Sequence, residues 1–542
     1  MKTRRLLILI VTLTLIVVGL GLLLNSVSAD PSGTVSGVVV DANGPVAEAV
    51  VRQQTTANST TSAADGSFTL GGLTEGISVT ITGWNEGYHP GGVEVIPSQS
   101  GVTITINRHP AGDDPTYEWI TSMADPEEPV ACEHCMVAFP DWVNNAHAQA
   151  GTNPRFFSLY NGTDLSGTTT VSPGYKLDFP GTAGNCATCH APGAATDDEP
   201  FTADMNELEG VETEGVFCDF CHKIGYAYLN PAMGLPYPNA PGILSFRLHR
   251  PPPDTHMFFG PFDDVTRRVS YLELEKKSQF CAPCHQFSFW GTPIYESFRE
   301  WLESPYPAMG IECQTCHMKP TGVDYFVFPE KGGLIRDPQT IASHLQPGAA
   351  DVELLQNTVS MTLSARQVAD NLRVSVTITN TDAGHHVPTD FPARNMILLV
   401  RATDDQEWEL AQVAGPTVPD WGGVGPDPDD YAGWPGKGYA KVLRNVVSGE
   451  APVASYWKQS LIQSDNRLAA FEADTTTYDF LVPKGGGDVE VEARLIFRRA
   501  FKPLAEAKGW EMEDVVMETE VVAISLRPTR RVYLPAVMRK TE

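Results

Sequence analysis

The sequence has few basic residues, and this shortage limits the partners that the protein can have. Its 542 residues include 38 lysines and arginines against 66 aspartates and glutamates, so the formal net charge is −28. Binding to nucleic acid needs a basic surface that neutralises phosphates, so neither DNA nor RNA is expected as a partner. An acidic surface suits a solvated protein that stays soluble after export, or one that is steered toward basic partners.

Long apolar runs are also lacking, except at the N-terminus. Three basic residues precede an apolar run over residues 6–24, and a small-x-small pattern then ends at Ala29. These features predict a signal peptide over residues 1–29 that is cleaved after Ala29. The run could also span a bilayer if it stayed uncleaved, so membrane association is expected only through such an anchor. Either alternative predicts an extracytoplasmic protein, in the periplasm, at the cell surface or secreted.

Cysteine is absent before residue 132 and after residue 316, and both of these flanking regions have the pattern of β-strands. The stretches "GVVVDANGPVAEAVV" and "ADGSFTLGGL" resemble the carboxypeptidase-regulatory-like β-sandwich, which implies a structural or adhesive module over residues 31–108. Alternating stretches such as "NLRVSVTITNT" predict a second β-rich domain over residues 351–525. Residues 526–542 are left as a C-terminal tail.

All ten cysteines form Cys-x-x-Cys pairs, and four of the five pairs are followed at once by histidine, in "CATCH", "CDFCH", "CAPCH" and "CQTCH". Only 13 of the 542 residues are histidine, so chance does not explain four such matches. Cys-x-x-Cys-His is the attachment signature of c-type haem, in which the cysteines form thioethers and the histidine binds iron. A zinc site would not demand the trailing histidines. A disulfide across so short a loop is usually reactive rather than structural.

Four haem c groups are therefore expected. The predicted attachment residues are Cys186, Cys189, Cys218, Cys221, Cys281, Cys284, Cys313 and Cys316. The predicted proximal iron ligands are His190, His222, His285 and His317.

The fifth pair, Cys132 and Cys135, is followed by Met136 in place of histidine. A methionine thioether can bind haem iron, so one alternative is a fifth haem with Met136 as a ligand. The other is a haem-free cysteine pair that is oxidised outside the cell. The sequence leaves both alternatives open.

Regular periodicity is weak over residues 120–348, where porphyrins could replace part of the apolar core. Helices are expected near residues 266–280 and 294–302. The predicted fold class is multidomain: an N-terminal β-sandwich, a central haem-packed multihaem cytochrome c domain of mostly α-helical and irregular structure, and a C-terminal β-rich domain.

The motif spacing contains a repeat. Cys186 and Cys218 are 32 residues apart, as are Cys281 and Cys313, and "GVFCDFCH" matches "GIECQTCH". This predicts a duplicated two-haem unit with neighbouring haems close together.

The stretches "SQFCAPCH" and "YESFREWLESPYPAMGIECQTCHM" resemble the multihaem cytochrome c family of the tetrahaem cytochrome c-554 type. "TNTDAGHHVPTDFPARN" resembles the β domain that often follows such haem domains. The resemblance covers roughly residues 125–500 and implies electron transfer through closely packed haems, mostly with two histidine ligands each. His147 matches the family position of a distal ligand. The other candidate distal ligands are His256, His344 and one of the pair His385 and His386, with His249 a weaker candidate.

The expected function is therefore that of an exported multihaem cytochrome that passes electrons to redox partner proteins. The alternative is a multihaem oxidoreductase that acts on a small nitrogen or sulfur compound at an open haem iron. Enough candidate histidines exist for four irons, and no clear catalytic constellation is visible, so electron transfer is favoured and no catalytic residue is predicted.

Overall fold

The computed structural model describes residues 33–123, 135, 137–197, 201–253 and 255–529. The predicted signal peptide, Cys132, Met136 and most of the predicted tail lie outside the described residues. The chain divides into two compact units, Met1–Gly112 with Asp254–Leu272, and Asp113–Pro253 with Glu273–Glu542. Within the described segments, no helix combines the length and the apolar character needed to cross a bilayer.

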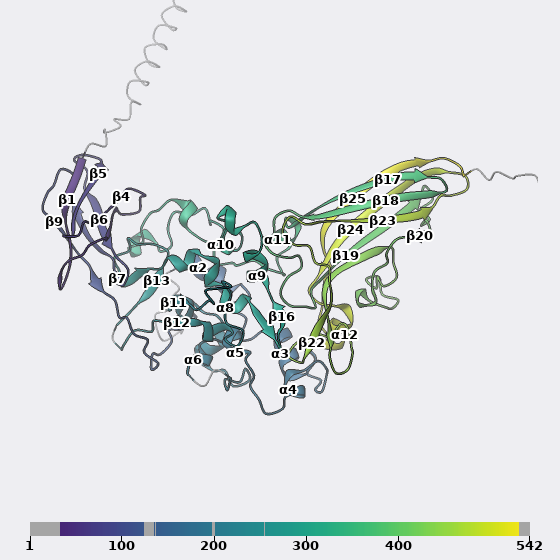
Figure 1. The fold of residues 1–542 in the computed structure, drawn as a ribbon, viewed down its shortest axis with the longest axis horizontal. Coiled ribbons are helices and arrows are strands. Elements are labelled where there is room, and N and C mark those ends of the chain that lie inside the picture. Colours follow the sequence, from purple (N-terminus) through teal and green to yellow (C-terminus); the bar gives the residue numbers. More distant parts are fainter. Residues whose placement is uncertain (1–32, 124–134, 136, 198–200, 254, 530–542) are drawn as a thin grey trace, which may run out of the picture. The chain divides into compact units, whose positions relative to one another are not determined.

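The first unit consists of two small sheets around one apolar core (Figure 1). One sheet contains β1 (Gly33–Asp41), β2 (Gly44–Pro45), β5 (Ser67–Leu73) and β9 (Val102–Thr105). The other has the order β4 (Ser59–Thr61), β3 (Val50–Gln53), β6 (Val79–Trp84) and β8 (Gly91–Val95). Two further strand pairs complete the unit: β7 (Tyr88–His89) with β10 (Asn107–Arg108), and β13 (Phe258–Gly260) with β14 (Val269–Tyr271). Alternating apolar residues of β1 and β5, such as Val35, Val39, Phe68 and Leu70, are buried in the core.

The motif-bearing part of the second unit is built from short elements. Its helices are α2 (Ala138–Val143), α3 (Pro154–Asn161), α4 (Tyr175–Asp178), α5 (Ala187–His190), α6 (Ala194–Asp197), α7 (Cys218–Cys221), α8 (Ala282–His285), α9 (Ser297–Leu302) and α10 (Cys313–His317). Its 3-10 turns are η1 (Gly210–Glu214), η2 (Gly242–Ser245), η3 (Glu273–Lys276), η4 (Ser278–Phe280), η5 (Pro307–Met309), η6 (Pro329–Lys331) and η7 (Pro338–Thr340). Its strands are β11 (Ile224–Ala227), β12 (Phe246–Leu248), β15 (Phe287–Phe289) and β16 (Thr292–Tyr295).

The predicted fold class, with a mostly α-helical and irregular central domain, is wrong. Helix makes up 18% of the structure and strand 33%, with many sheets and few helices. In the motif region the longest described helix, α3, has eight residues, and hairpins follow two of the motifs. Each motif needs only one helical turn to bring its side chains together, and the aromatic alternation in "FSFWGTPIY" around Gly291 (φ +82°) favours a hairpin.

The two helices expected in this region have different outcomes. The prediction of a helix near residues 266–280 is wrong, because that stretch contains β14 followed by the 3-10 turns η3 and η4. The helix expected near residues 294–302 is confirmed over Ser297–Leu302 as α9, although its first residues belong to β16.

The C-terminal part of the second unit contains two antiparallel sheets with a common core. One has the order β17 (Val359–Val368), β18 (Asn371–Asn380), β23 (Ala473–Leu481) and β20 (Gln412–Ala414). The other has the order β22 (Ser460–Asp465), β21 (Gly436–Asn445), β19 (Asn395–Asp404), β24 (Gly487–Arg498) and β25 (Val515–Leu526). Short helical elements connect them: α11 (Val352–Gln356), η8 (Asp420–Gly422) and α12 (Lys502–Lys508). Strand residues such as Val376, Leu398 and Val491 are fully buried in this core.

Candidate functional site

Each Cys-x-x-Cys-His motif forms a single helical turn. In the first three motifs the backbone N–H of the histidine donates to the carbonyl of the first cysteine, at 3.0 to 3.1 Å. The fourth motif forms the helix α10, Cys313–His317. Residues i, i+3 and i+4 of a helix share one face, so the two thiols and the imidazole of each motif point the same way.

The four motifs lie close together, and the third lies at their centre. The thiol of Cys284, in the third motif, lies near enough to that of Cys189 in the first for each to affect the ionisation of the other. The thiol of Cys281, also in the third motif, interacts in the same way with the thiol of Cys313 in the fourth. Cys221, in the second motif, is near enough to influence the ionisation of both third-motif thiols.

Glycine is required where the chain passes the first motif. Gly242 has a φ of +55°, and a Cβ atom there would lie 1.9 Å from the carbonyl oxygen of Thr188 and 2.8 Å from Sγ of Cys189. Any side chain at this position would therefore displace an attachment cysteine. The isolated glycine in "NAPGILSF" gave no sign of this role in the sequence.

Two motif histidines face a second histidine. The rings of His285 and His147 have centroids 6.2 Å apart and are inclined by 73°. The rings of His317 and His385 have centroids 6.4 Å apart and are inclined by 16°. These pairs join residues that are far apart in the sequence.

His222, in the second motif, and His344 lie near enough to interact electrostatically. Burial and the neighbouring His222 lower the pKa of His344 to about 4. The buried side chain of Asn145 links this pair to the first one: its amide donates to the carbonyl of His344 at 2.6 Å, and its oxygen accepts from the N–H of His147 at 2.9 Å. Sequence reasoning missed Asn145, for which the only signal was its place in "NNAHAQA".

The Nδ1 atoms of most of these histidines already have a partner. Nδ1 contacts the carbonyl oxygen of Pro347 at 2.7 Å in His317 and that of His386 at 2.9 Å in His385. A carboxylate takes this place in two motif histidines, Glu275 at 3.4 Å from His222 and Asp390 at 3.5 Å from His285. An occupied Nδ1 fixes the tautomer that presents Nε2 to a metal.

The Asp390 carboxylate and the His285 imidazole alter the ionisation of each other. Burial by itself would lower the pKa of His285, but the hydrogen bond and charge of Asp390 outweigh it and raise that pKa. Burial by itself would raise the pKa of Asp390, but His285 holds it well below its usual range. Sequence reasoning missed Asp390, which follows "HHVPT" in the chain, and Glu275.

His190, in the first motif, has different surroundings. The ring against it is that of Phe156, with centroids 4.2 Å apart and planes inclined by 26°. Burial lowers the pKa of His190 to about 4. Two hydrogen-bonded tyrosines, Tyr295 and Tyr456, have their hydroxyl oxygens 2.9 Å apart and interact electrostatically with the attachment residue Cys186.

The remaining candidates from the sequence lie elsewhere. His256 is exposed and belongs to the first unit. His386 contacts the carboxylate of Glu300 at 3.6 Å instead of a motif histidine. His249 is buried and its N–H donates to the carbonyl of Lys223. Cys135 interacts electrostatically with Cys218 of the second motif, and burial raises the pKa of its thiol to about 11.

No protein-family model matches the sequence, and no curated protein matches it. Among solved structures, the chain is similar to a penta-haem cytochrome c552 from Thermochromatium tepidum, with a TM-score of 0.50 and 20% identity. The match covers 73% of this chain and 99% of that chain. The protein therefore has a multihaem cytochrome c-like fold.

The residues at the motifs fit haem c. Two imidazoles that bind one metal through bonds of about 2 Å, with roughly 1 Å more from each nitrogen to its ring centre, have centroids about 6 Å apart. The spacings of 6.2 and 6.4 Å agree with this value. The side chain of His285 keeps 44% of its surface exposed, so a bound group could reach its ring. Both cysteines and the histidine of each motif lie within one helical turn, as the attachment signature of haem c requires.

Proposed function

We propose that the protein is an exported multihaem c-type cytochrome that transfers electrons through closely spaced, covalently bound haems. The observation that carries this proposal is the pairing of motif histidines with second histidines at a spacing suited to one iron atom. An iron with two imidazole ligands has no free position for a substrate and changes only its oxidation state.

The haems, when bound, supply reversible one-electron oxidation and reduction at iron. The chain holds them through the eight cysteines of the four complete motifs. In the proposed ligand sets, His285 pairs with His147, His317 with His385 and His222 with His344. Carbonyl and carboxylate groups at Nδ1 orient these imidazoles and adjust how strongly they donate to the metal.

The arrangement of the motifs supports a branched relay with the third motif at its centre. Thiols of the third motif lie close enough to thiols of the first and fourth to affect their ionisation, so groups attached there would be neighbours. Electrons entering at one motif would reach the others through the third motif.

Redox titration followed by visible and electron paramagnetic resonance spectra tests this function. We expect covalently bound haem, low-spin signals for at least three irons and several one-electron midpoint potentials. The removal of the third motif by Cys281→Ala with Cys284→Ala should leave the other haems reducible by a small reductant but slow the exchange of electrons between them. A protein without covalent haem, or with high-spin irons throughout, would contradict the proposal.

The flanking parts have supporting roles in this proposal. The N-terminal run supports export, through a cleaved signal peptide or an anchor, to the periplasm or the cell surface. The first unit, with its two sheets, would be a carboxypeptidase-regulatory-like module that serves as a scaffold or contact surface. The partners would be redox proteins, because nothing in the acidic composition favours nucleic acid.

One observation favours a second candidate function, reduction or oxidation of a small nitrogen or sulfur compound. His190 has the ring of Phe156 stacked against it, whereas His285 and His317 each have the ring of a second histidine facing them. The iron held by His190 would then have an open position. The hydrogen-bonded, partly buried hydroxyl groups of Tyr295 and Tyr456 could orient a small polar ligand near Cys186.

Ligand binding to the reduced and oxidised protein separates the two functions. Cyanide, nitrite and hydroxylamine serve as probes, and an open iron should give one high-spin signal that becomes low-spin when a probe binds. A Tyr456→Phe variant should weaken binding of a hydrogen-bonding probe but not of carbon monoxide. A spectrum that no probe alters would leave electron transfer as the only function.

A further inference from the structure

The loop between β18 and β19 carries residues for two of the motif sites. His385 faces His317 of the fourth motif, with ring centroids 6.4 Å apart. Five residues later, the carboxylate of Asp390 lies 3.5 Å from Nδ1 of His285 in the third motif. The loop belongs to the C-terminal β-rich part of the unit, so its position relative to the motifs has to be held by other contacts.

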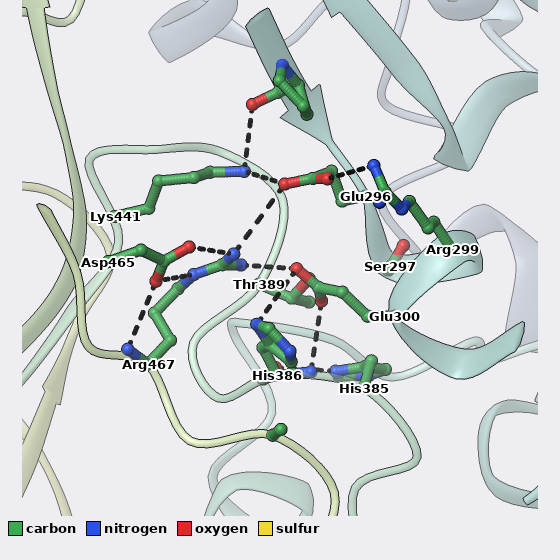
Figure 2. A network of polar contacts seen from close by, with 12 residues as sticks. Glu296, Ser297, Arg299, Glu300, His385, His386, Thr389, Lys441, Asp465 and Arg467 are labelled. Atoms are coloured by element: carbon green, nitrogen blue, oxygen red, sulfur yellow. Dashed lines mark hydrogen bonds and ion pairs between the residues drawn. The ribbon is translucent and has the colours of Figure 1, made fainter. Parts of the chain in front are cut away.

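Glu300, on the helix α9, holds this loop from the motif side. Its Oε2 atom accepts hydrogen bonds from the backbone N–H of His386 at 3.1 Å and from the hydroxyl of Thr389 at 2.5 Å (Figure 2). The side chain of Glu300 is buried. A buried carboxylate is stable only with such donors, so these bonds tie the loop to α9.

Arg467 completes the attachment from the β-rich side. Its Nη1 atom donates to Oε1 of Glu300 at 2.6 Å, and its Nε and Nη2 atoms donate to the carboxylate of Asp465 at 2.8 and 2.7 Å (Figure 2). Nη1 also lies 3.4 Å from the carbonyl oxygen of Pro388. The planar guanidinium thus fixes Glu300 in one orientation.

The link from Glu300 to the imidazole of His385 has only two steps. The N–H of His386 donates to Glu300, and the carbonyl of the same residue contacts Nδ1 of His385 at 2.9 Å. Asn380 braces the loop from the other side, since its buried amide donates to the carbonyl of His385 at 2.9 Å. Displacement of the His386 backbone would therefore turn the His385 ring.

We propose that Glu300 and Arg467 are positioning residues that hold His385 as the second ligand of the haem bound at His317. The proposal rests on the proposed function, because it requires haem at the fourth motif. Neither residue contacts the iron site itself, and both act through the backbone of the His385–His386 segment. The β-rich part of the unit then determines the coordination of a haem instead of serving only as a scaffold.

The test compares Glu300→Gln, Arg467→Lys and Thr389→Val with wild-type protein. The readouts are haem content, the low-spin resonance signals and the midpoint potentials. Glu300→Gln and Thr389→Val each weaken one side of the link without emptying the site, so they should fold with full haem content. We expect one low-spin signal to change its g values and one midpoint potential to shift by about 59 mV, which equals a tenfold change in a one-electron equilibrium. Arg467→Lys should shift the same potential less.

Two further variants make the outcome unambiguous. Glu409→Gln removes the same charge from the exposed Arg401–Glu409 pair of the same β-rich region and should change no haem signal. His385→Ala should convert one iron from low-spin to high-spin. If His385→Ala has this effect while Glu300→Gln and Thr389→Val leave every signal and potential unchanged, the positioning role is overturned. If His385→Ala itself changes nothing, the proposed ligand assignment fails instead.

Discussion

The carboxylate of Asp390 lies 3.5 Å from Nδ1 of His285 in the third motif. The corresponding Nδ1 atom of His317, in the fourth motif, contacts the backbone carbonyl of Pro347 instead. A full negative charge beside an iron ligand makes the imidazole a stronger electron donor than a neutral carbonyl does. Stronger donation stabilises the oxidised iron, which carries more positive charge, more than it stabilises the reduced iron. The haem at the third motif should therefore have a lower midpoint potential than the haem at the fourth.

Asp390→Asn should raise the midpoint potential of the third-motif haem. The substitution removes the charge but keeps an oxygen that can accept the Nδ1 hydrogen bond, so the low-spin state should persist. The expected rise is about 50 mV, close to a tenfold change in the one-electron equilibrium. Redox titration of the visible spectrum measures it, with the exposed Asp370→Asn as a control for loss of charge. An unchanged set of potentials would show that Asp390 does not influence the iron.

His147→Ala should remove the second ligand of the haem at His285 and leave the other haems intact. The rings lie 6.2 Å apart, and the segment that carries His147 is held by Asn145. We expect one iron to become high-spin and to bind cyanide, as followed by electron paramagnetic resonance. Gln149→Ala, at an exposed position two residues further along the chain, serves as the control. A low-spin spectrum in His147→Ala would assign this iron a different ligand.

The mass of the mature protein should show four covalent haems. The four complete motifs each have a histidine to bind iron, whereas Met136 stands in that place after Cys132 and Cys135. Cys186→Ala with Cys189→Ala should lower the mass by one haem, and Cys132→Ala with Cys135→Ala should change it only by the two substitutions. A fifth increment that disappears in the second double variant would establish haem at the Cys-x-x-Cys-Met pair.

The attachment motifs could be predicted from the sequence because their chemistry depends on a spacing within five residues. The pairing of His317 with His385, or of His285 with His147, could not be derived in the same way. Each pair joins segments that are remote in the chain. His385 reaches His317 only because the β-rich part of the chain packs against α9. For the same reason the sequence left His385 and His386 as equal candidates, although one faces His317 and the other contacts Glu300.

The secondary structure of the motif region was predicted less well. Its helices are only about one turn long. The alternation of Phe287 and Phe289 before Gly291 indicates a hairpin, which the prediction of a mostly α-helical and irregular domain did not include. The buried partners Asp390, Glu275 and Asn145 were missed because single polar residues in loops carry no periodic signal. Their roles depend on contacts that are visible only in three dimensions.

Lys508→Met should destabilise the second unit. The ammonium group of Lys508 is fully buried and donates to the carbonyls of Ser158, Thr163 and Val171 at 2.9, 3.0 and 2.6 Å. Methionine has a similar length but no donor, so three carbonyl oxygens would lose a partner. Each buried group left without a hydrogen bond costs about 1–3 kcal/mol, and we expect the free energy of unfolding to fall by about 3 kcal/mol after partial relaxation.

The Lys508→Met substitution should also affect the surroundings of His190 in the first motif. Ser158 lies on α3, the helix whose Phe156 stacks on His190, and Trp510 donates to the hydroxyl of Ser158 at 3.0 Å. The guanidinium unfolding midpoint, followed by haem absorbance, measures the loss of stability, and the exposed Lys484→Met is the control. Because α3 is loosened, the absorbance of the haem at His190 should change at a lower denaturant concentration than that of the others. Simultaneous loss of all haem signals at an unshifted midpoint would show that Lys508 does not brace this helix.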